Sequence, residues 1–478
     1  MTAENDIRSL LPSSCIVTIP DVEAHVQAAT PRWSDSGLSH PYAVATPSSE
    51  ADIIAIIAYT RTNKLKIIPA NGGHGSYVPV NGGTIYLDMS SFKDVVLNET
   101  EEEVTIGGGC VTSEVLNQLT PKGWYTALPN SNAVGVIGAF IGGLSHSLNG
   151  KHGLGIDVVK SIRIIPFSST EPLDIGPNSQ GQEKELFNVL CGAGHGLGII
   201  TSVTLQAFPI SNLSLTDNKI WTRRLIFPAP QISAAARLYT SFWPPHPKLV
   251  SVLIFLRAPP SAPRPGAPMI MLALSYFGPA EAAEKVTAKS FDEEFTSKAI
   301  VNMTVPIEWE KANDGSAPLN AHGGFKEYFS CYCKETSLGS IERTFGAWEK
   351  FTSKDLLGRG TSYVVIGSWS TEQMVAKGGQ KDEKFFVARD RGIFVQCVPW
   401  YKDIGVKADA DAFGNEVIDM LREQDRARGT KDWCFVNNIR EGIDVGEIYT
   451  DEQIESIRAV KGIWDEEALG WNPVVEGW

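Results

Sequence analysis

The sequence predicts an α+β fold built from two domains. Three observations point to it: the chain has 478 residues, its glycines are unevenly placed, and its element pattern changes near residue 212. A chain of this length is too long for one hydrophobic core. Sixteen of the 44 glycines fall between Gly72 and Gly155. We therefore expect a glycine-rich first domain over 1–210, a second domain over 211–430, and a C-terminal segment over 431–478.

The first domain is expected to mix helices with short strands. Ser49 is a favourable N-cap and Asp52 stands at N3, as in a capping box, ahead of an apolar i, i+3, i+4 pattern. A second helix is expected at 111–119. Short apolar runs predict strands at 65–69, 84–88, 104–106, 158–166 and 199–208. The glycine clusters between them indicate turns with positive φ and close approaches of the backbone.

The second domain is expected to contain a mainly antiparallel sheet with helices on one face. Longer strands are predicted at 248–257, 269–277, 362–369 and 393–400, and amphipathic helices at 340–353 and 411–428. The proline-rich stretch 258–268 predicts a loop, because proline cannot pair within a central strand.

Composition and motifs exclude several functions. The net charge of −13 and the absence of basic clusters argue against a nucleic-acid partner. No run approaches the ~18 apolar residues of a membrane span, and without a secretory signal a cytoplasmic location is expected. Seven cysteines predict no disulfide framework and no metal site. The sequence contains no match to the phosphate-binding P-loop, the Rossmann fingerprint or the hydrolase nucleophile elbow.

Three glycine-rich motifs stand in order across residues 40–208. The first is Pro69-Ala-Asn-Gly-Gly-His-Gly-Ser76. The second runs from Ser131-Asn-Ala-Val-Gly135-Val-Ile-Gly138 to Lys151-His-Gly153-Leu-Gly-Ile-Asp157. The third is Leu190-Cys-Gly192-Ala-Gly194-His-Gly-Leu-Gly198-Ile-Ile200. Together they resemble the FAD-linked oxidases of the vanillyl-alcohol-oxidase superfamily, in particular the berberine-bridge-enzyme-like group and its fungal members in secondary metabolism.

The resemblance implies a two-subdomain PCMH-type FAD-binding domain followed by a substrate-binding domain. A dinucleotide needs backbone N–H donors that converge on its diphosphate, and glycine lets the chain come that close. The expected cofactor-binding residues are Asn71, Gly72, Gly73, His74, Gly75, Ser76, Pro129, Ser131, Val134, Gly135, Gly138, Gly142, Gly143, Gly153, Gly198, Ile200 and Asn437.

His74 matches the histidine that carries the flavin through its 8α-methyl group in this family, which implies a covalent link. Some members add a bond to a cysteine in the second motif. Here Ser131 stands at that place, so a single attachment is expected. The sequence also departs from the family's triple glycine at Gly142-Gly143-Leu144, and His146 nearby faces either the flavin or solvent.

The last 45 residues resemble the family's C-terminal return to the FAD domain. Val436-Asn437-Asn438 replaces a usual Val-Asn-Tyr, and Lys461-Gly-Ile-Trp-Asp465 resembles the family's Lys-x-x-x-Asp. Asn438 removes the tyrosine that the family would offer as a base. Tyr401, Tyr332 and Glu327 are therefore the candidate catalytic residues, on the inner face of the second domain.

Four functions are weighed. The first is an FAD-dependent oxidase that takes a hydride from a small organic substrate, with O2 as acceptor. The second is a flavin-containing cyclase, and the third is a nicotinamide-dependent flavin reductase. The fourth is a flavin- or sugar-binding protein without catalysis. The oxidase is the leading hypothesis, and the sequence leaves the substrate and the oligomeric state open.

Overall fold

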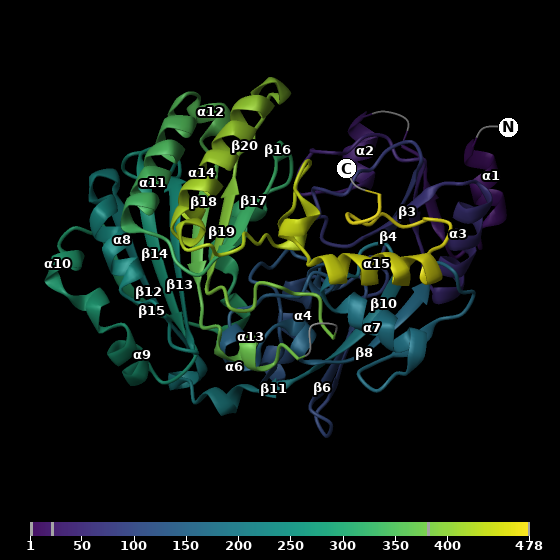
Figure 1. Cartoon of the computed structure of the whole chain (residues 1–478), viewed down its shortest axis with the longest axis horizontal. Coiled ribbons are helices and arrows are strands. Elements are labelled where there is room, and N and C mark those ends of the chain that lie inside the picture. The colour runs from purple at the N-terminus through teal and green to yellow at the C-terminus, as the bar shows by residue number, and fades with distance from the viewer. Residues whose placement is uncertain (1–2, 21–22, 380–382, 477–478) are drawn as a thin grey trace.

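A computed structural model describes residues 3–20, 23–379 and 383–476, and it confirms the α+β fold. Figure 1 shows the second domain on the left and the glycine-rich domain on the right. No helix in the described ranges is long and apolar enough to cross a membrane.

The first subdomain contains a four-stranded sheet in the order β1-β2-β4-β3. Strands β2, β4 and β3 are parallel, and β1 is antiparallel to β2. Helix α3 starts at the predicted N-cap: Ser49 accepts from the backbone N–H of Asp52, and the Asp52 carboxylate accepts from the N–H of Ser49. The elements are α1 (Ala3–Leu10), β1 (Ile16–Thr18), α2 (Glu23–Ala29), β2 (Ala43–Thr46), α3 (Glu50–Thr62), β3 (Lys66–Ala70) and β4 (Thr84–Asp88).

The second subdomain contains an antiparallel sheet in the order β5-β6-β10-β8-β9. Its strands are β5 (Val95–Asn98), β6 (Glu103–Gly107), β8 (Val159–Pro166), β9 (Leu173–Ile175) and β10 (Gly198–Gln206). Its helices are α4 (Thr112–Leu119), α5 (Val136–Phe140), α6 (Asn149–His152) and α7 (Gly181–Ala193). A two-stranded sheet of β7 (Trp124–Tyr125) and β11 (Phe208–Pro209) closes it. The glycine motifs lie at the ends of these elements.

The second domain is built on a seven-stranded antiparallel sheet in the order β15-β12-β14-β13-β18-β19-β17. Its strands are β12 (Ile220–Pro228), β13 (Leu249–Arg257), β14 (Pro268–Tyr276), β15 (Val301–Ile307), β17 (Phe329–Cys333), β18 (Tyr363–Ser368) and β19 (Ile393–Val398). A short pair, β16 (Phe325–Lys326) and β20 (Trp400–Tyr401), lies apart from it.

Helices cover one face of this sheet and leave the other bare. On β13, residues alternate between buried and half-buried, as expected for a strand whose two faces meet different surroundings. The buried set, which includes Leu253 and Phe255, packs in one core with side chains of α8, α11 and α14. The helices of this domain are α8 (Ile232–Thr240), α9 (Ala280–Val286), α10 (Glu293–Thr296), α11 (Leu338–Ser353), α12 (Leu356–Arg359), α13 (Glu372–Ala376) and α14 (Lys407–Ala427).

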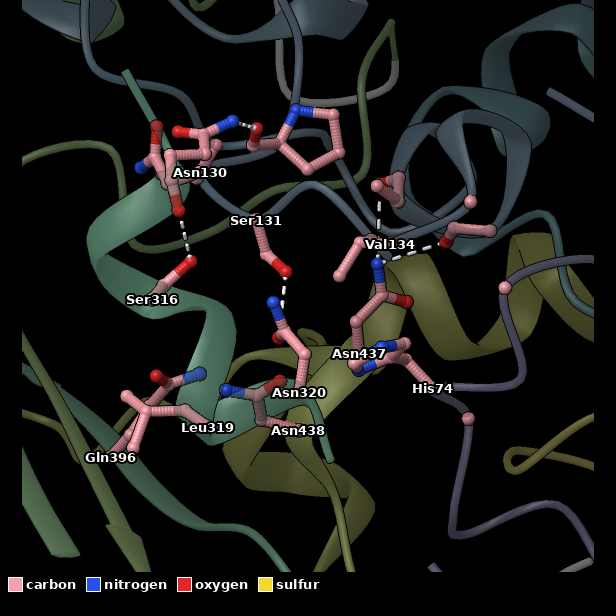
Figure 2. Close-up of a pocket in the computed structure, with 18 of the residues that line it drawn as sticks. His74, Asn130, Ser131, Val134, Ser316, Leu319, Asn320, Gln396, Asn437 and Asn438 are labelled. Atoms are coloured by element: carbon pink, nitrogen blue, oxygen red, sulfur yellow. Dashed lines mark hydrogen bonds between the residues drawn. The ribbon is translucent and has the colours of Figure 1, made fainter. Parts of the chain in front are cut away.

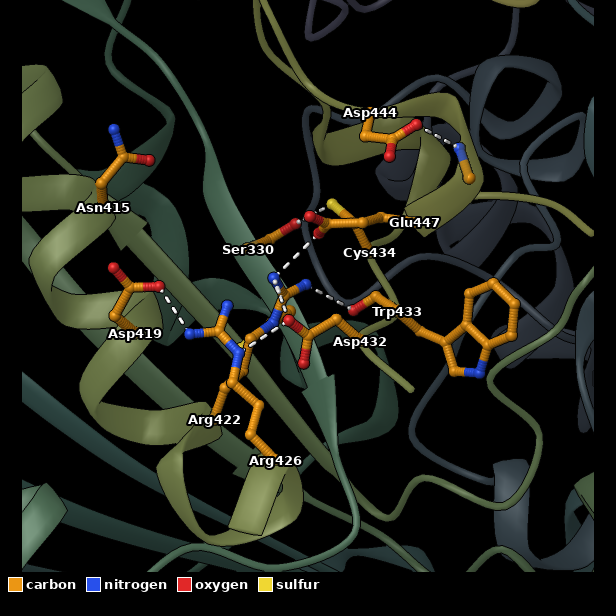
Figure 3. A network of polar contacts seen from close by, with 12 residues as sticks. Ser330, Asn415, Asp419, Arg422, Arg426, Asp432, Trp433, Cys434, Asp444 and Glu447 are labelled. Atoms are coloured by element: carbon orange, nitrogen blue, oxygen red, sulfur yellow. Dashed lines mark hydrogen bonds and ion pairs between the residues drawn. The ribbon is translucent and has the colours of Figure 1, made fainter. Parts of the chain in front are cut away.

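The C-terminal segment leaves α14 and runs back along the first domain, where α15 (Asp451–Trp464) packs beside α7 (Figure 1). A buried arginine fixes its start. From α14, Arg422 reaches Glu447 at 2.8 Å and Asp432 at 3.4 Å, and donates to the Trp433 carbonyl (Figure 3). The Trp433 carbonyl also accepts from the backbone N–H of Tyr332 at 2.9 Å. These contacts hold in place the turn that carries Asn437 and Asn438.

Candidate functional site

A cavity of about 820 Å³ lies between the glycine loops of the first domain and the bare face of the seven-stranded sheet. This volume falls in the range of pockets that bury a small-molecule ligand. Half-buried residues of the sheet, such as Val252, Ile254 and Ala273, form one wall. The opposite wall includes Asn71, Gly72, Gly73, His74, Gly75, Pro129, Ser131, Val134, Gly135, Gly138, Gly198, Ile200 and Asn437. The structure thus brings thirteen of the seventeen predicted cofactor-binding residues to one cavity.

The first glycine loop, Gly72–Gly75, has room for no side chain at two positions. A Cβ on Gly72 would lie 2.2 Å from the carbonyl oxygen of Ala133, and Gly73 has a φ of +69°. Among the described residues, no acceptor pairs with the backbone N–H groups of this loop. Successive unpaired N–H groups form an anion-binding concavity. Ser76 was predicted to bind the cofactor but does not line the cavity. It is buried behind the loop, where its N–H donates to the His74 carbonyl at 3.0 Å.

The His74 imidazole lines the cavity as a neutral ring with a nitrogen unpaired among the described residues. It stacks on Trp33, with ring centroids 5.7 Å apart. No described residue forms a hydrogen bond with its Nε2. Burial, helped by the charges of His322 and Lys326, lowers the pKa of His74 to about 3. The ring is therefore neutral at physiological pH, which is the form that can act as a nucleophile.

The second glycine loop crosses over the first. A Cβ on Gly135 would lie 2.8 Å from the side chain of Asn71, which donates to the Cys110 carbonyl at 2.8 Å. Ser131 lines the cavity and its hydroxyl donates to Asn320 Oδ1 at 2.8 Å, as Figure 2 shows. Ser131 therefore belongs to a contact between the two domains.

Asn437 ties the C-terminal segment to this loop. Its Nδ2 donates to the carbonyls of Gly138 at 3.0 Å and Ala139 at 3.2 Å (Figure 2). Its Oδ1 accepts from the Tyr77 hydroxyl at 3.4 Å. A Cβ on Gly142 would lie 2.3 Å from Asn437. Gly142 thus permits this approach and does not itself line the cavity.

Gly143 and Gly153 lie outside the cavity, against the prediction. A Cβ on Gly143 would meet the Phe386 ring at 2.6 Å, and one on Gly153 would meet the Asp157 carboxylate at 2.5 Å. Both glycines have positive φ, so backbone shape and packing explain them. His146 is buried, does not line the cavity, and has its Nε2 2.9 Å from the Gly153 carbonyl.

The third glycine loop brings a histidine to the cavity. His195 is 6% exposed, and its Nε2 lies 3.0 Å from the Tyr77 hydroxyl. Its carbonyl accepts from Asn472 of the C-terminal segment at 2.7 Å. Three segments distant in sequence therefore meet at this wall.

The structure places none of the three candidate bases in the lining of the cavity, against the prediction. Tyr332 lies one layer behind it, with its ring 4.9 Å from that of Phe394. Glu327 points to α14 and forms an ion pair with Lys407 at 3.1 Å. Tyr401 pairs with Phe325 on the separate two-stranded sheet and is buried in the core under the helices.

Several residues that were not predicted from the sequence also line the cavity. Tyr328 stacks on Trp33 with ring centroids 4.7 Å apart, and Tyr363 packs in the same cluster. Gln396 and Asn438 add neutral amides, seen in Figure 2 below Asn320. The alternation along β18 and β19 could have placed Gln396. Nothing in the sequence signalled Tyr328, which enters through a loop.

The cavity fits FAD by its own geometry. Buried polar atoms at its wall have no partner among the described residues: Arg32 Nη1, His74 Nε2, His195 Nδ1 and Asn438 Nδ2. Buried polar groups are rarely left unpaired in folded proteins. With the unpaired N–H groups of the first loop, they suit a large polar ligand that carries an anionic diphosphate.

Comparisons with known proteins point the same way. Residues 41–168 match the family described as an FAD binding domain. The chain is 28% identical over 460 residues to the FAD-linked oxidoreductase azaG of Aspergillus niger, covering 94% of this chain and 93% of that protein. It is 25% identical over 474 residues to the FAD-linked oxidoreductase hasG of Aspergillus fumigatus, covering 97% of each.

Solved structures share the fold at low identity. Physcomitrella patens BBE-like 1 superimposes with a TM-score of 0.79 at 14% identity, over 99% of this chain and 98% of that one. The glucooligosaccharide oxidase from Acremonium strictum gives 0.77 at 18% identity over the whole of both chains. That oxidase is described as carrying a 6-S-cysteinyl, 8α-N1-histidyl FAD.

The fold and the site define an FAD-linked oxidoreductase. More particularly, the chain is similar to the fungal FAD-linked oxidoreductases azaG and hasG over more than nine tenths of its length and of theirs, and it has the fold of berberine-bridge-enzyme-like proteins.

Proposed function

We propose that this protein is an oxidase of fungal secondary metabolism that takes a hydride from a carbon of a small, uncharged organic molecule. The acceptor proposed for the reduced cofactor is O2, and the cofactor is FAD held by one covalent link to His74. The observation that carries the proposal is the cavity itself. The residues of the His74 loop and those of an apolar sheet face line this one cavity together.

FAD supplies hydride acceptance at N5 when bound. The residues of the chain bind and orient the substrate against it. Val252, Ile254 and Ala273 give the substrate an apolar wall and exclude water. Gln396 and Asn438 offer amide hydrogen bonds that can fix a hydroxyl or carbonyl group. Such a wall, with few polar groups at set places, is typical of small-molecule sites.

The charges of the cavity disfavour a cationic substrate, because its lining includes Arg224 and Lys311 but a single carboxylate among the described residues. Asp314 is the one carboxylate among the described lining residues, and it lies exposed at the rim, where it accepts from Asn132 at 2.9 Å. A cationic amine would find no buried counter-charge on the substrate side. An oligosaccharide would leave its hydroxyl groups against the apolar strands. A hydroxylated aromatic or alkyl compound suits the walls better.

The single covalent link is supported by the neutral His74 ring and by Ser131. In the glucooligosaccharide oxidase the flavin is described as carrying both a histidyl and a cysteinyl bond. Here a serine stands where the resemblance places the cysteine, and the seven cysteines of the chain are buried elsewhere.

Two measurements test the proposal. In acid precipitation, a yellow pellet is expected from the protein and a colourless one from His74→Ala. Turnover of a panel of neutral aromatic and alkyl alcohols should consume O2 and release hydrogen peroxide, whereas amines and oligosaccharides should not. Product formation without O2 uptake, and without bleaching of the flavin under anaerobic conditions, would contradict the oxidase and indicate a cyclase.

A further inference from the structure

Arg32 is a buried arginine that forms no ion pair with the described residues. It follows α2, is 6% exposed, and lines the cavity beside the first glycine loop. Its Nη2 donates to the Gly75 carbonyl, and its Nη1 is buried with no partner in the described part of the chain. None of the ion pairs formed by the described residues includes it.

A guanidinium in this position implies an anionic ligand. Burying an unpaired charge costs on the order of several kcal/mol unless an opposite charge compensates it. Burial lowers the pKa of Arg32 from its usual value, yet arginine stays protonated in proteins. The two tyrosines nearby, Tyr77 and Tyr86, are themselves buried and neutral, because burial raises their pKa values. Asp35 adds a favourable charge at longer range, but its carboxylate accepts from the N–H of Gly324 at 2.7 Å and forms no ion pair with Arg32 in the described part of the chain. A charge that pairs directly with the guanidinium therefore has to come from a ligand.

The segment around Arg32 also shapes the glycine loop. The backbone N–H of Trp33 donates to the Gly73 carbonyl at 3.0 Å, and Arg32 holds the Gly75 carbonyl. A Cβ on Gly73 would lie 2.3 Å from the Pro31 carbonyl. The carbonyls of Gly73 and Gly75 are thus engaged by Trp33 and Arg32, while no described acceptor pairs with the loop's N–H groups. The unpaired Nη1 of Arg32 and the unpaired N–H groups of the loop both belong to residues that line the cavity.

We propose that Arg32 binds the diphosphate of FAD through Nη1 and supplies the positive charge that the glycine loop lacks. Backbone N–H groups give direction but only partial charge. A guanidinium adds a full charge and a planar donor pair suited to phosphate oxygens. Arg32 then makes the site selective for the dinucleotide over flavins without a diphosphate. This inference rests on FAD binding by the cavity and not on the oxidase activity.

The test compares two ligands that differ in the phosphate part. His74→Ala makes binding reversible in the full-length chain, and the apoprotein is titrated with FAD and with riboflavin by flavin fluorescence. Arg32→Gln in this background is expected to weaken FAD binding about 10- to 100-fold and to change riboflavin binding by less than about threefold. Arg32→Lys keeps the charge and loses the planar pair of donors. Its affinity for FAD should therefore lie between that of the His74→Ala background and that of Arg32→Gln.

Arg224→Gln is the matched control, because Arg224 lines the same cavity from the sheet side. It should leave the FAD-to-riboflavin ratio unchanged. Equal weakening of both ligands by Arg32→Gln, or no weakening of either, would overturn the proposal. Equal weakening would assign Arg32 to loop structure alone, and no change would assign its charge to a substrate anion.

A second readout covers the case in which Arg32→Gln does not fold. ADP carries the diphosphate without the flavin, and it should raise the melting temperature of the His74→Ala apoprotein, since a ligand that binds only the folded state stabilises it. The shift should be smaller in Arg32→Lys. An ADP shift that is absent in the His74→Ala apoprotein, or unaltered by Arg32→Lys, would equally contradict the proposal.

Discussion

Replacing Lys461 with methionine should destabilise the first domain strongly. Lys461 lies on α15, is 2% exposed, and its Nζ is 2.6 Å from the carboxylate of Asp465. The same ammonium donates to the Gly470 carbonyl at 2.9 Å and to the Gly196 carbonyl at 3.2 Å. It therefore joins the C-terminal segment to the third glycine loop.

The size of the effect follows from what the substitution leaves behind. Lys461→Met removes the partner of two carboxylates, the buried Asp465 and Glu476 at 3.2 Å, and of two carbonyls that lose their donor. Removing one partner of a buried ion pair costs ~3–5 kcal/mol. Asp465 keeps two backbone donors, Leu469 at 2.7 Å and Gly470 at 3.0 Å, so the lower end applies. About 3 kcal/mol corresponds to roughly 6–12 °C in melting temperature for a domain of about 200 residues.

Thermal unfolding followed by circular dichroism and by flavin release measures the effect. Lys285→Met is the control, because the Lys285–Glu281 pair is exposed (74% and 81%) and such pairs contribute little. The double variant Lys461→Met/Asp465→Asn should recover part of the loss, since the fully buried carboxylate is then replaced by a neutral amide. If Lys461→Met lowers the melting temperature no more than Lys285→Met does, the reasoning from the buried pair is refuted.

Three further outcomes are expected. Gly72→Ala should lower the flavin-to-protein absorbance ratio, because its Cβ would lie 2.2 Å from the Ala133 carbonyl; a full flavin load would contradict this. Tyr332→Phe should leave kcat unchanged and should not lower the melting temperature, since its buried hydroxyl has no described partner whose hydrogen bond could be lost; a tenfold loss of kcat would restore it as a base. Burial lowers the pKa values of His146 and His195 to about 4, against ~6.5 when unfolded, so the unfolded chain binds more protons between these values. Stability should therefore fall as the pH drops from 6.5 to 4, and a flat melting profile would exclude this.

The regular elements could be predicted where the sequence itself carries a period. The strand at 84–88 is found at Thr84–Asp88, and 269–277 corresponds to Pro268–Tyr276. The capping box at Ser49 is confirmed because it needs only local residues. The glycine loops were visible for a similar reason, since a backbone that must approach another closely leaves glycine in the sequence.

The elements that were missed depend on distant partners. Strands β12 and β15 contain Arg223 and Arg224, or Asn302 and Thr304, which interrupt an apolar pattern. Arg223 is nevertheless buried, because Ser290 and Asn302 accept its hydrogen bonds. The candidate bases failed for a related reason. Residue type alone does not say which face of a strand meets the cavity, and a one-residue change of register reverses it.

The return of the C-terminal segment bears on the order in which the protein is made. Asn437, Lys461 and Asn472 all hold glycine loops of the first domain, yet they lie in the last 45 residues of the chain. A ribosome finishes the second domain before these residues leave it. The FAD pocket can therefore close only around a complete polypeptide, and a nascent or prematurely terminated chain would lack one wall of the flavin site.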